Sequence, residues 1–227
     1  MWQELRNELH GKGIEIVTVA LDTDAKAARS IIEAVAPSHP SLIDQHHLIG
    51  TLFGIVNVPS GIWIDEEGTI VRPPEPAFPK PSVYRDAPIS DSLPQRIQDM
   101  LAEVKKMKTE PEKYLAALRD WVERGSESRY ALSPDEVIER SRPRPAEHAE
   151  AAAHFELGEY LHSSGQPEAA TRHWREAHRL QPDNWTYKRQ AWSLADPAQG
   201  PTDLYEGDWL SDVRKIGAEH YYPPLQM

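Results

Sequence analysis

The distribution of proline sets the first limit on what this chain can fold into. Seven of the 20 prolines lie between residues 72 and 94. Because proline fixes φ and has no backbone N–H, we expect neither a helix nor a strand ladder to persist there. Helix and strand patterns alternate before this stretch, and only helical patterns follow it. We therefore expect an α/β domain over residues 1–75, a proline-rich linker over 76–95 and an α-helical domain over 96–227.

Composition narrows the classes of protein. The chain has 227 residues, 39% of them hydrophobic and 27% charged, and no apolar run approaches the roughly 18 residues of a membrane helix. The net charge of -11 disfavours nucleic acid as a partner. Because residues 1–9 lack the apolar core of a secretion signal, we expect the chain as written in the cytoplasm. A start further upstream would leave its location open.

The chain contains no cysteine, which removes disulfides, cysteine-bound zinc and every thiolate nucleophile from these residues. None of the ten histidines has metal-binding spacing: His46 and His47 are adjacent, while His173 and His178 are five apart. We therefore expect no metal site. Nucleotide-binding glycine motifs are also absent from the sequence, so no cofactor is expected.

The first 75 residues carry the signals of a small α/β sheet. A β-branched, nearly continuous apolar run at 14–21 predicts a strand covered on both faces. Asp22 and Asp24 offer caps for the helix that follows. Ser41 to Asp44 is a plausible short strand, and 62–71 predicts a β-hairpin. Capping and turn formation are the favoured roles of three aspartates that follow strands, Asp22, Asp44 and Asp65.

One stretch of the helical part resembles a 34-residue tetratricopeptide repeat, a pair of antiparallel helices, at about residues 148–182. Small residues let the two helices approach, and one tryptophan fills the gap between them. The residues that carry this resemblance are Leu157, Gly158, Gly165, Ala170, Trp174, Ala177 and Pro182. His154 and Leu161 depart from the motif, which has Trp and Tyr there. A single pair cannot bury its own faces, so the aromatic-rich helices around it are expected to complete the stack.

The α/β part resembles the thioredoxin-like superfamily, in particular redoxins of the ResA and TlpA type and peroxiredoxins of the AhpC/TSA type. Residues 53–71 carry the resemblance, which covers about residues 1–72. It implies that Val58–Pro59 is a cis peptide bond that binds the extended backbone of a substrate. The implied fold class is an incomplete thioredoxin-like sandwich followed by the helical domain.

The departure from that family lies at the start of the chain. In these proteins a central strand that ends in a cysteine motif comes before the helix with which this sequence begins. One explanation is a start called too late, with a cysteine or selenocysteine motif encoded upstream. The other is a degenerate redoxin in which the strands near Ile14 and Ile62 pair directly or borrow an edge from another chain. Open sheet edges would then favour self-association.

Two functions follow from these patterns. The first is a redoxin-family thiol-disulfide oxidoreductase or peroxidase whose catalytic strand is absent from this chain, so that the chain alone is inactive and has no catalytic residue of its own. The alternative is a non-enzymatic interaction module that binds a protein or peptide through its helical domain. We expect Ser60 to form a hydrogen bond with the backbone rather than to act as a nucleophile. We expect the helix face with Arg172, Arg175 and Arg179 to be a solvated surface rather than a binding site for an acidic peptide.

Overall fold

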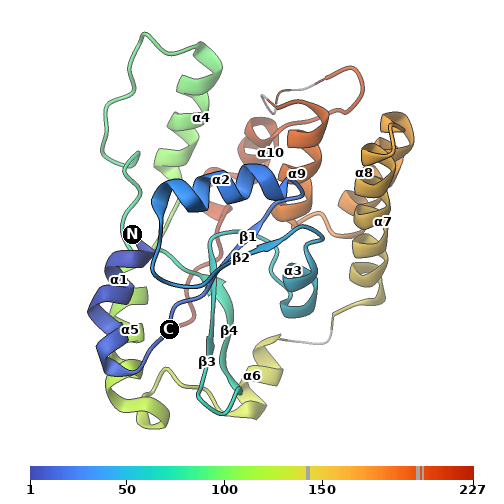
Figure 1. Ribbon diagram of the computed structural model, residues 1–227. Helices are drawn as coiled ribbons and strands as arrows, with labels where there is room; N and C mark the ends of the chain where they lie inside the picture. Colours follow the sequence, from blue (N-terminus) through green and yellow to red (C-terminus); the bar gives the residue numbers. More distant parts are fainter. Residues whose placement is uncertain (142–143, 198–199, 201) are drawn as a thin grey trace.

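The computed structural model describes residues 1–141, 144–197, 200 and 202–227. It is a mixed α/β structure with a helical majority, about 54% helix and 9% strand. Figure 1 shows the strands near the middle of the molecule, with α1 (Trp2–Leu9) and α5 (Pro111–Arg124) on one side and α7 (Ala146–Ser163) and α8 (Pro167–Leu180) on the other. None of the described helices combines the length and the apolar character needed to cross a lipid bilayer.

The first two strands form a parallel pair. β1 (Thr18–Leu21) pairs with β2 (Ser41–Asp44), with Thr18 opposite Ser41 and Leu21 opposite Asp44. The strand is therefore shorter than the predicted run over 14–21. The ladder starts where the amide of Thr18 donates to the carbonyl of Pro40, which has no N–H to extend it.

The helices around this pair leave apolar surface uncovered. Asp24 caps α2 (Ala25–Val35) by accepting from the amides of the first turn, as predicted. Ala28 is buried, whereas Ile31 and Val35 on the same helix are 66% and 68% exposed. α3 (Leu48–Phe53) also has exposed leucines. Large apolar side chains on both helices are therefore exposed in the described structure.

The predicted β-hairpin is present. β3 (Ser60–Ile64) runs antiparallel to β4 (Ile70–Pro76), and Asp65 closes the turn, with its Oδ1 2.7 Å from the amide of Thr69. The expectation that no strand persists after residue 72 is wrong, because β4 continues to Pro76. β4 pairs on one side only among the described residues, so its prolines need not donate to a ladder.

A buried arginine ties the hairpin to distant parts of the chain. Arg72 is 2% exposed and donates to the carbonyls of Tyr130 (2.6 Å) and Gln226 (2.8 Å). Its Nε lies 3.1 Å from Oε1 of Glu75. The hairpin packs with α1, α5 and the C-terminus in one core, across the expected boundaries of the linker: Leu5, Leu9, Trp63, Ala77, Tyr114, Ala117, Leu118 and Leu225.

A second core lies among the later helices. α7 and α8 form the expected antiparallel pair, and Gly165 between them has a φ of 76°, which favours glycine. Gly158 packs against Trp174, which is completely buried. The other helices are α4 (Gln95–Lys106), α6 (Pro134–Ser141), α9 (Trp185–Ala195) and α10 (Trp209–Ile216), with short 3₁₀ turns at His10–Lys12, Gly125–Glu127 and Ala218–His220.

We predict that Gly158→Ala destabilises the fold. A Cβ at this position would lie 2.5 Å from Cδ1 and Nε1 of Trp174, a contact that forces the pair apart. Such overpacking costs about 1–3 kcal/mol of unfolding free energy. Urea denaturation measures it, with Gly11→Ala as control because nothing lies within 4 Å of a Cβ there. A Gly158→Ala protein as stable as the control would contradict this packing.

Candidate functional site

A cavity of about 260 Å³ lies at the carboxyl end of β1. Leu21 and Asp22 line it from the strand, His47 from the start of α3, and Asn57 and Val58 from the loop before β3. The carboxyl ends of parallel strands are where ligands bind most often in α/β folds. The side chains of α9 that complete the lining are Trp185, Thr186, Arg189, Gln190 and Ser193.

His47 is the polar side chain of this cavity that stands out. It is 2% exposed, has a left-handed backbone with a φ of 52°, and packs edge-on against Phe155 with ring centroids 5.1 Å apart. Neither ring nitrogen makes a hydrogen bond of good geometry within the described structure, although Gln190 favours the protonated ring. Burial lowers the pKa of His47, while Asp44 opposes the shift. The ring is therefore neutral at neutral pH, with polar atoms that a ligand could use.

His47 could not be recognised from histidine spacing. His46 and His47 are adjacent, and adjacent histidines give no indication of which one is buried. The signal that places His47 inside is tertiary, because Phe155 and Tyr187 come from distant helices.

The Val58–Pro59 peptide bond is cis. The amide of Val58 donates to Oδ1 of Asn57 (2.9 Å), and its carbonyl accepts from the hydroxyl of Tyr222 (3.1 Å). Asn57 in turn donates to the carbonyl of Tyr221. One lone pair of the Val58 carbonyl oxygen therefore remains for the amide of a substrate backbone. The binding of substrate at Val58 and Pro59 stays a prediction.

The N-terminus of α9 holds the cavity loop from the other side. The amides of Trp185 and Thr186 both donate to the carbonyl of Val56, at 2.7 and 3.3 Å. These amides belong to the first turn, where helix donors have no partner inside the helix. The contact seats α9 over the cavity, so the helical part of the chain closes the site.

One edge of β1 has no strand beside it in the described structure, since β1 pairs with β2 alone. The amides of Thr18 and Asp22 donate toward β2, to the carbonyls of Pro40 and Asp44. Amides alternate in direction along a strand, so those of Val19 and Leu21 point to the open edge. Parallel sheets are ordinarily larger and covered on both faces. This edge can therefore accept another strand.

Most other residues considered in the sequence have structural roles. Asp22 accepts from the amide of Asp24, and Asp44 accepts from the amides of Leu48 and Ile49 at the start of α3. Ser60 donates to the carbonyl of Asn57. These contacts agree with capping and turn formation rather than with acid–base chemistry.

The residues of the helix-pair motif lie together on α7, α8 and their flanks. Ala170, Trp174 and Ala177 are buried, whereas Leu157 is 41% exposed. The arginine face of α8 is partly neutralised, because Arg175 pairs with Glu206 and Arg179 with Glu176. An acidic peptide would have to compete with both carboxylates.

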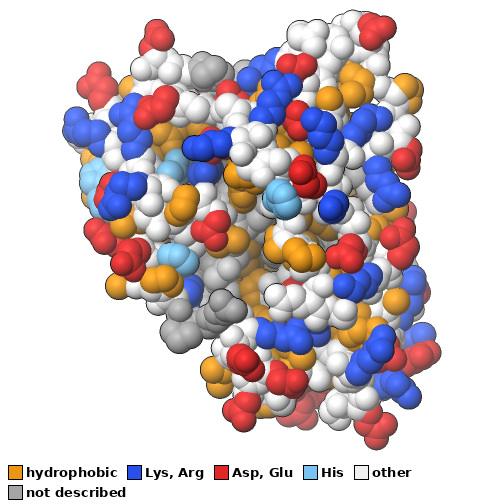
Figure 2. Space-filling model, turned by 180° about the vertical axis from the view of Figure 1, so that it is seen from behind, with side chains coloured by type: hydrophobic (Ala, Val, Ile, Leu, Met, Phe, Trp, Pro, Cys, Tyr) orange, Lys and Arg blue, Asp and Glu red, His pale blue; other side chains and the backbone are white. Residues whose placement is uncertain are grey.

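A second cavity, of about 370 Å³, lies between α3 and the helix pair. Its polar groups include Arg144, His148, Gln181 and Asn184. Figure 2 shows the rear face hollowed near its middle, with acidic and basic side chains interspersed around the hollow. The described surface of this face therefore has no broad region of one charge, as an extended nucleic-acid interface would need.

A group of potential metal ligands lies elsewhere in the described structure. Glu150, His154 and Glu176 lie together on the helix pair, and none of them lines the cavity at β1. The chain matches no protein-family model, no curated protein and no solved structure. The resemblances to redoxins and to tetratricopeptide repeats therefore rest on the residues of this chain.

The burial of the Glu159 carboxyl group on α7 reports how tightly the helix pair packs on the α/β part. Its Oε1 is buried with no hydrogen-bond partner in the described structure. Burial raises its pKa to about 8, and the nearby carboxylates Glu156 and Asp44 add to the shift. Because the folded state holds this proton more tightly than the unfolded chain, stability falls as pH rises from about 4.5 to 8.

We predict that Glu159→Gln stabilises the protein at pH 8 by about 1–3 kcal/mol and changes little at pH 4, where both side chains are neutral. Thermal unfolding across this pH range measures the difference. Glu139→Gln, at an exposed position of α6, is the control and should show no such trend. An equal effect of Glu159→Gln at both pH values would show that the carboxyl group is solvated.

Proposed function

We propose that the α/β part forms one half of a redoxin-type thiol-disulfide oxidoreductase or peroxidase site, the half that receives the strand with the catalytic thiol. One observation carries the proposal: β1 is paired on one side only and ends at the cavity that Val58 lines. A strand added parallel to β1 would also end near this cavity. A thiol placed directly after such a strand would lie within the cavity region.

The residue that leads into β1 supports an added segment. Val17 is more than half exposed. A strand beside β1 would pair with the amides of Val19 and Leu21 and would cover apolar surface next to them.

The thiol itself must come from residues outside positions 1–227, because these contain no cysteine. The family resemblance places it on a strand that precedes α1. A thiolate there would attack one sulfur of a substrate disulfide, and the second sulfur would leave as a thiolate. With a peroxide, the thiolate would take up the terminal O–H group to form a sulfenic acid, and alkoxide or hydroxide would leave.

The cavity offers this chemistry two groups. The neutral ring of His47 has one nitrogen that can accept a hydrogen bond from a thiol or a peroxide, and one N–H that can donate. The Val58 carbonyl oxygen accepts from the Tyr222 hydroxyl and has a second lone pair for the amide of an extended substrate. The helical part would shield the site, since α9 is seated on Val56.

Protein binding by the helical part is the second candidate function. It is favoured by the 370 Å³ cavity between α3 and the helix pair. Arg144 and His148 supply donors there, beside the amide side chains of Gln181 and Asn184. This set of groups suits a carboxylate of a bound peptide.

We predict that residues 1–227 alone do not accelerate the reduction of insulin disulfides or of hydrogen peroxide by dithiothreitol. The native polypeptide, purified from its source cells, should be heavier than 25.7 kDa and should contain a cysteine or selenocysteine ahead of α1. Intact-mass spectrometry and the same two assays test both statements. Activity should disappear when that residue is replaced by serine.

A native mass of 25.7 kDa without thiol-dependent activity would contradict the redoxin proposal and favour protein binding. Activity that survives the serine replacement would also contradict it, because the chemistry would then not use the added strand.

A further inference from the structure

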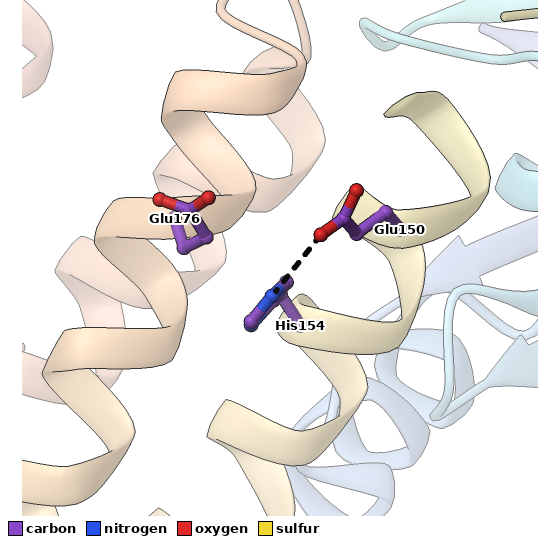
Figure 3. Close-up of side chains that lie close together, drawn as sticks. All are labelled: Glu150, His154 and Glu176. Atoms are coloured by element: carbon purple, nitrogen blue, oxygen red, sulfur yellow. Dashed lines mark ion pairs between the residues drawn. The ribbon is translucent and has the colours of Figure 1, made fainter. Parts of the chain in front are cut away.

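Four potential ligand residues face one another across the helix pair. Glu150 and His154 are one helical turn apart on α7, and His173 and Glu176 are three apart on α8. Each of these spacings puts both side chains on one face of a helix. One ligand atom from each of Glu150, His154 and Glu176 lies within 4.8 Å of the other two. Figure 3 shows Glu150 and His154 on one helix, joined by their ion pair, and Glu176 on the neighbouring helix.

The imidazole of His154 is positioned by a neighbour. Its Nδ1 lies 2.8 Å from Nδ1 of His173, and its Nε2 lies 4.0 Å from Oε1 of Glu150. When His154 donates from Nδ1 to His173, a lone pair remains on Nε2, toward Glu150. Metal-binding histidines are commonly held in this way, with the second ring nitrogen donating to an acceptor. His173 can take the acceptor role, because a neutral imidazole has one nitrogen with a free lone pair.

The backbone that carries these side chains is firmly packed. Ala151 and Phe155 on α7 and Ala177 on α8 are buried next to the ligand positions. Gly158 and Trp174 lock the two helices together one turn further along α7. Only the side-chain ends therefore need to move to close around an ion, and Glu150, at 59% exposed, is free to do so.

Arg179 is the competing group. Its guanidinium holds both carboxylate oxygens of Glu176, at 2.6 and 2.9 Å. The side chain of Arg179 is 65% exposed, and exposed ion pairs of this kind contribute little stability. A divalent ion could displace it at small cost.

We propose that Glu150, His154 and Glu176 bind one divalent transition-metal ion, with His173 as a positioning residue. The imidazole selects Zn²⁺, Co²⁺ or Ni²⁺ over Mg²⁺ and Ca²⁺, which prefer oxygen ligands alone. One nitrogen and two carboxylate ligands leave a coordination position for water or for a side chain of a partner. The site would bridge the two helices of the pair and stabilise their packing. This replaces the expectation drawn from histidine spacing alone.

Titration of the tag-free chain with Zn²⁺ by calorimetry, and with Co²⁺ by visible absorption, tests the proposal. We expect one equivalent to bind to the wild type, and His154→Ala to weaken binding at least about tenfold. Glu150→Gln should also weaken it, which keeps the test valid if His154→Ala perturbs the helix. Arg179→Ala should strengthen binding severalfold, because it frees the carboxylate of Glu176.

His220→Ala is the matched control, since His220 is an exposed histidine next to a glutamate, 3.8 Å away, outside the helix pair. It should leave the affinity unchanged. The proposal is overturned if the wild type binds no Zn²⁺, if His154→Ala and His220→Ala weaken binding equally, or if Arg179→Ala has no effect.

Discussion

The one-sided pairing of β1 is the constraint on which the rest of the account depends. A parallel pair of two strands offers few hydrogen bonds and leaves an edge of unpaired backbone groups. In this chain the edge carries the amides of Val19 and Leu21 and ends at a cavity. The exposed apolar side chains of α2 lie on the same unit. These features are the observations on which the proposal of an added strand depends.

The helical part gives this unit its enclosure. Contacts from α9 and from Tyr221 and Tyr222 reach the loop of residues 56–58, where they bind backbone carbonyls and the Asn57 side chain. Arg72 joins the hairpin to the C-terminus in a separate core. Through these contacts the cavity at β1 is shaped by two parts of the chain that the proline pattern separates. The proposed role of the helices in shielding a reactive group depends on this arrangement.

Sequence patterns of a few neighbouring residues were sufficient to predict turns, helix caps and contacts between adjacent helices. The hairpin around Asp65, the cap at Asp24 and the Gly158–Trp174 contact all depend on residues close in sequence or on a fixed repeat spacing. The prolines of β4 led to the wrong prediction that no strand continues after residue 72. Their effect depends on whether the strand is at an edge, which is a tertiary property. The burial of His47 and the grouping of His154 with Glu176 also depend on which helices meet, so histidine spacing could not reveal them.

Amide hydrogen exchange measured residue by residue by NMR tests the open edge most directly. In the isolated chain we expect Val19 and Leu21 to exchange much faster than Thr18 and Asp22, whose amides donate to β2. In a polypeptide that carries the proposed added strand, Val19 and Leu21 should become protected as well. Equal protection of all four amides in the isolated chain would contradict the account, because the edge of β1 would then already be satisfied.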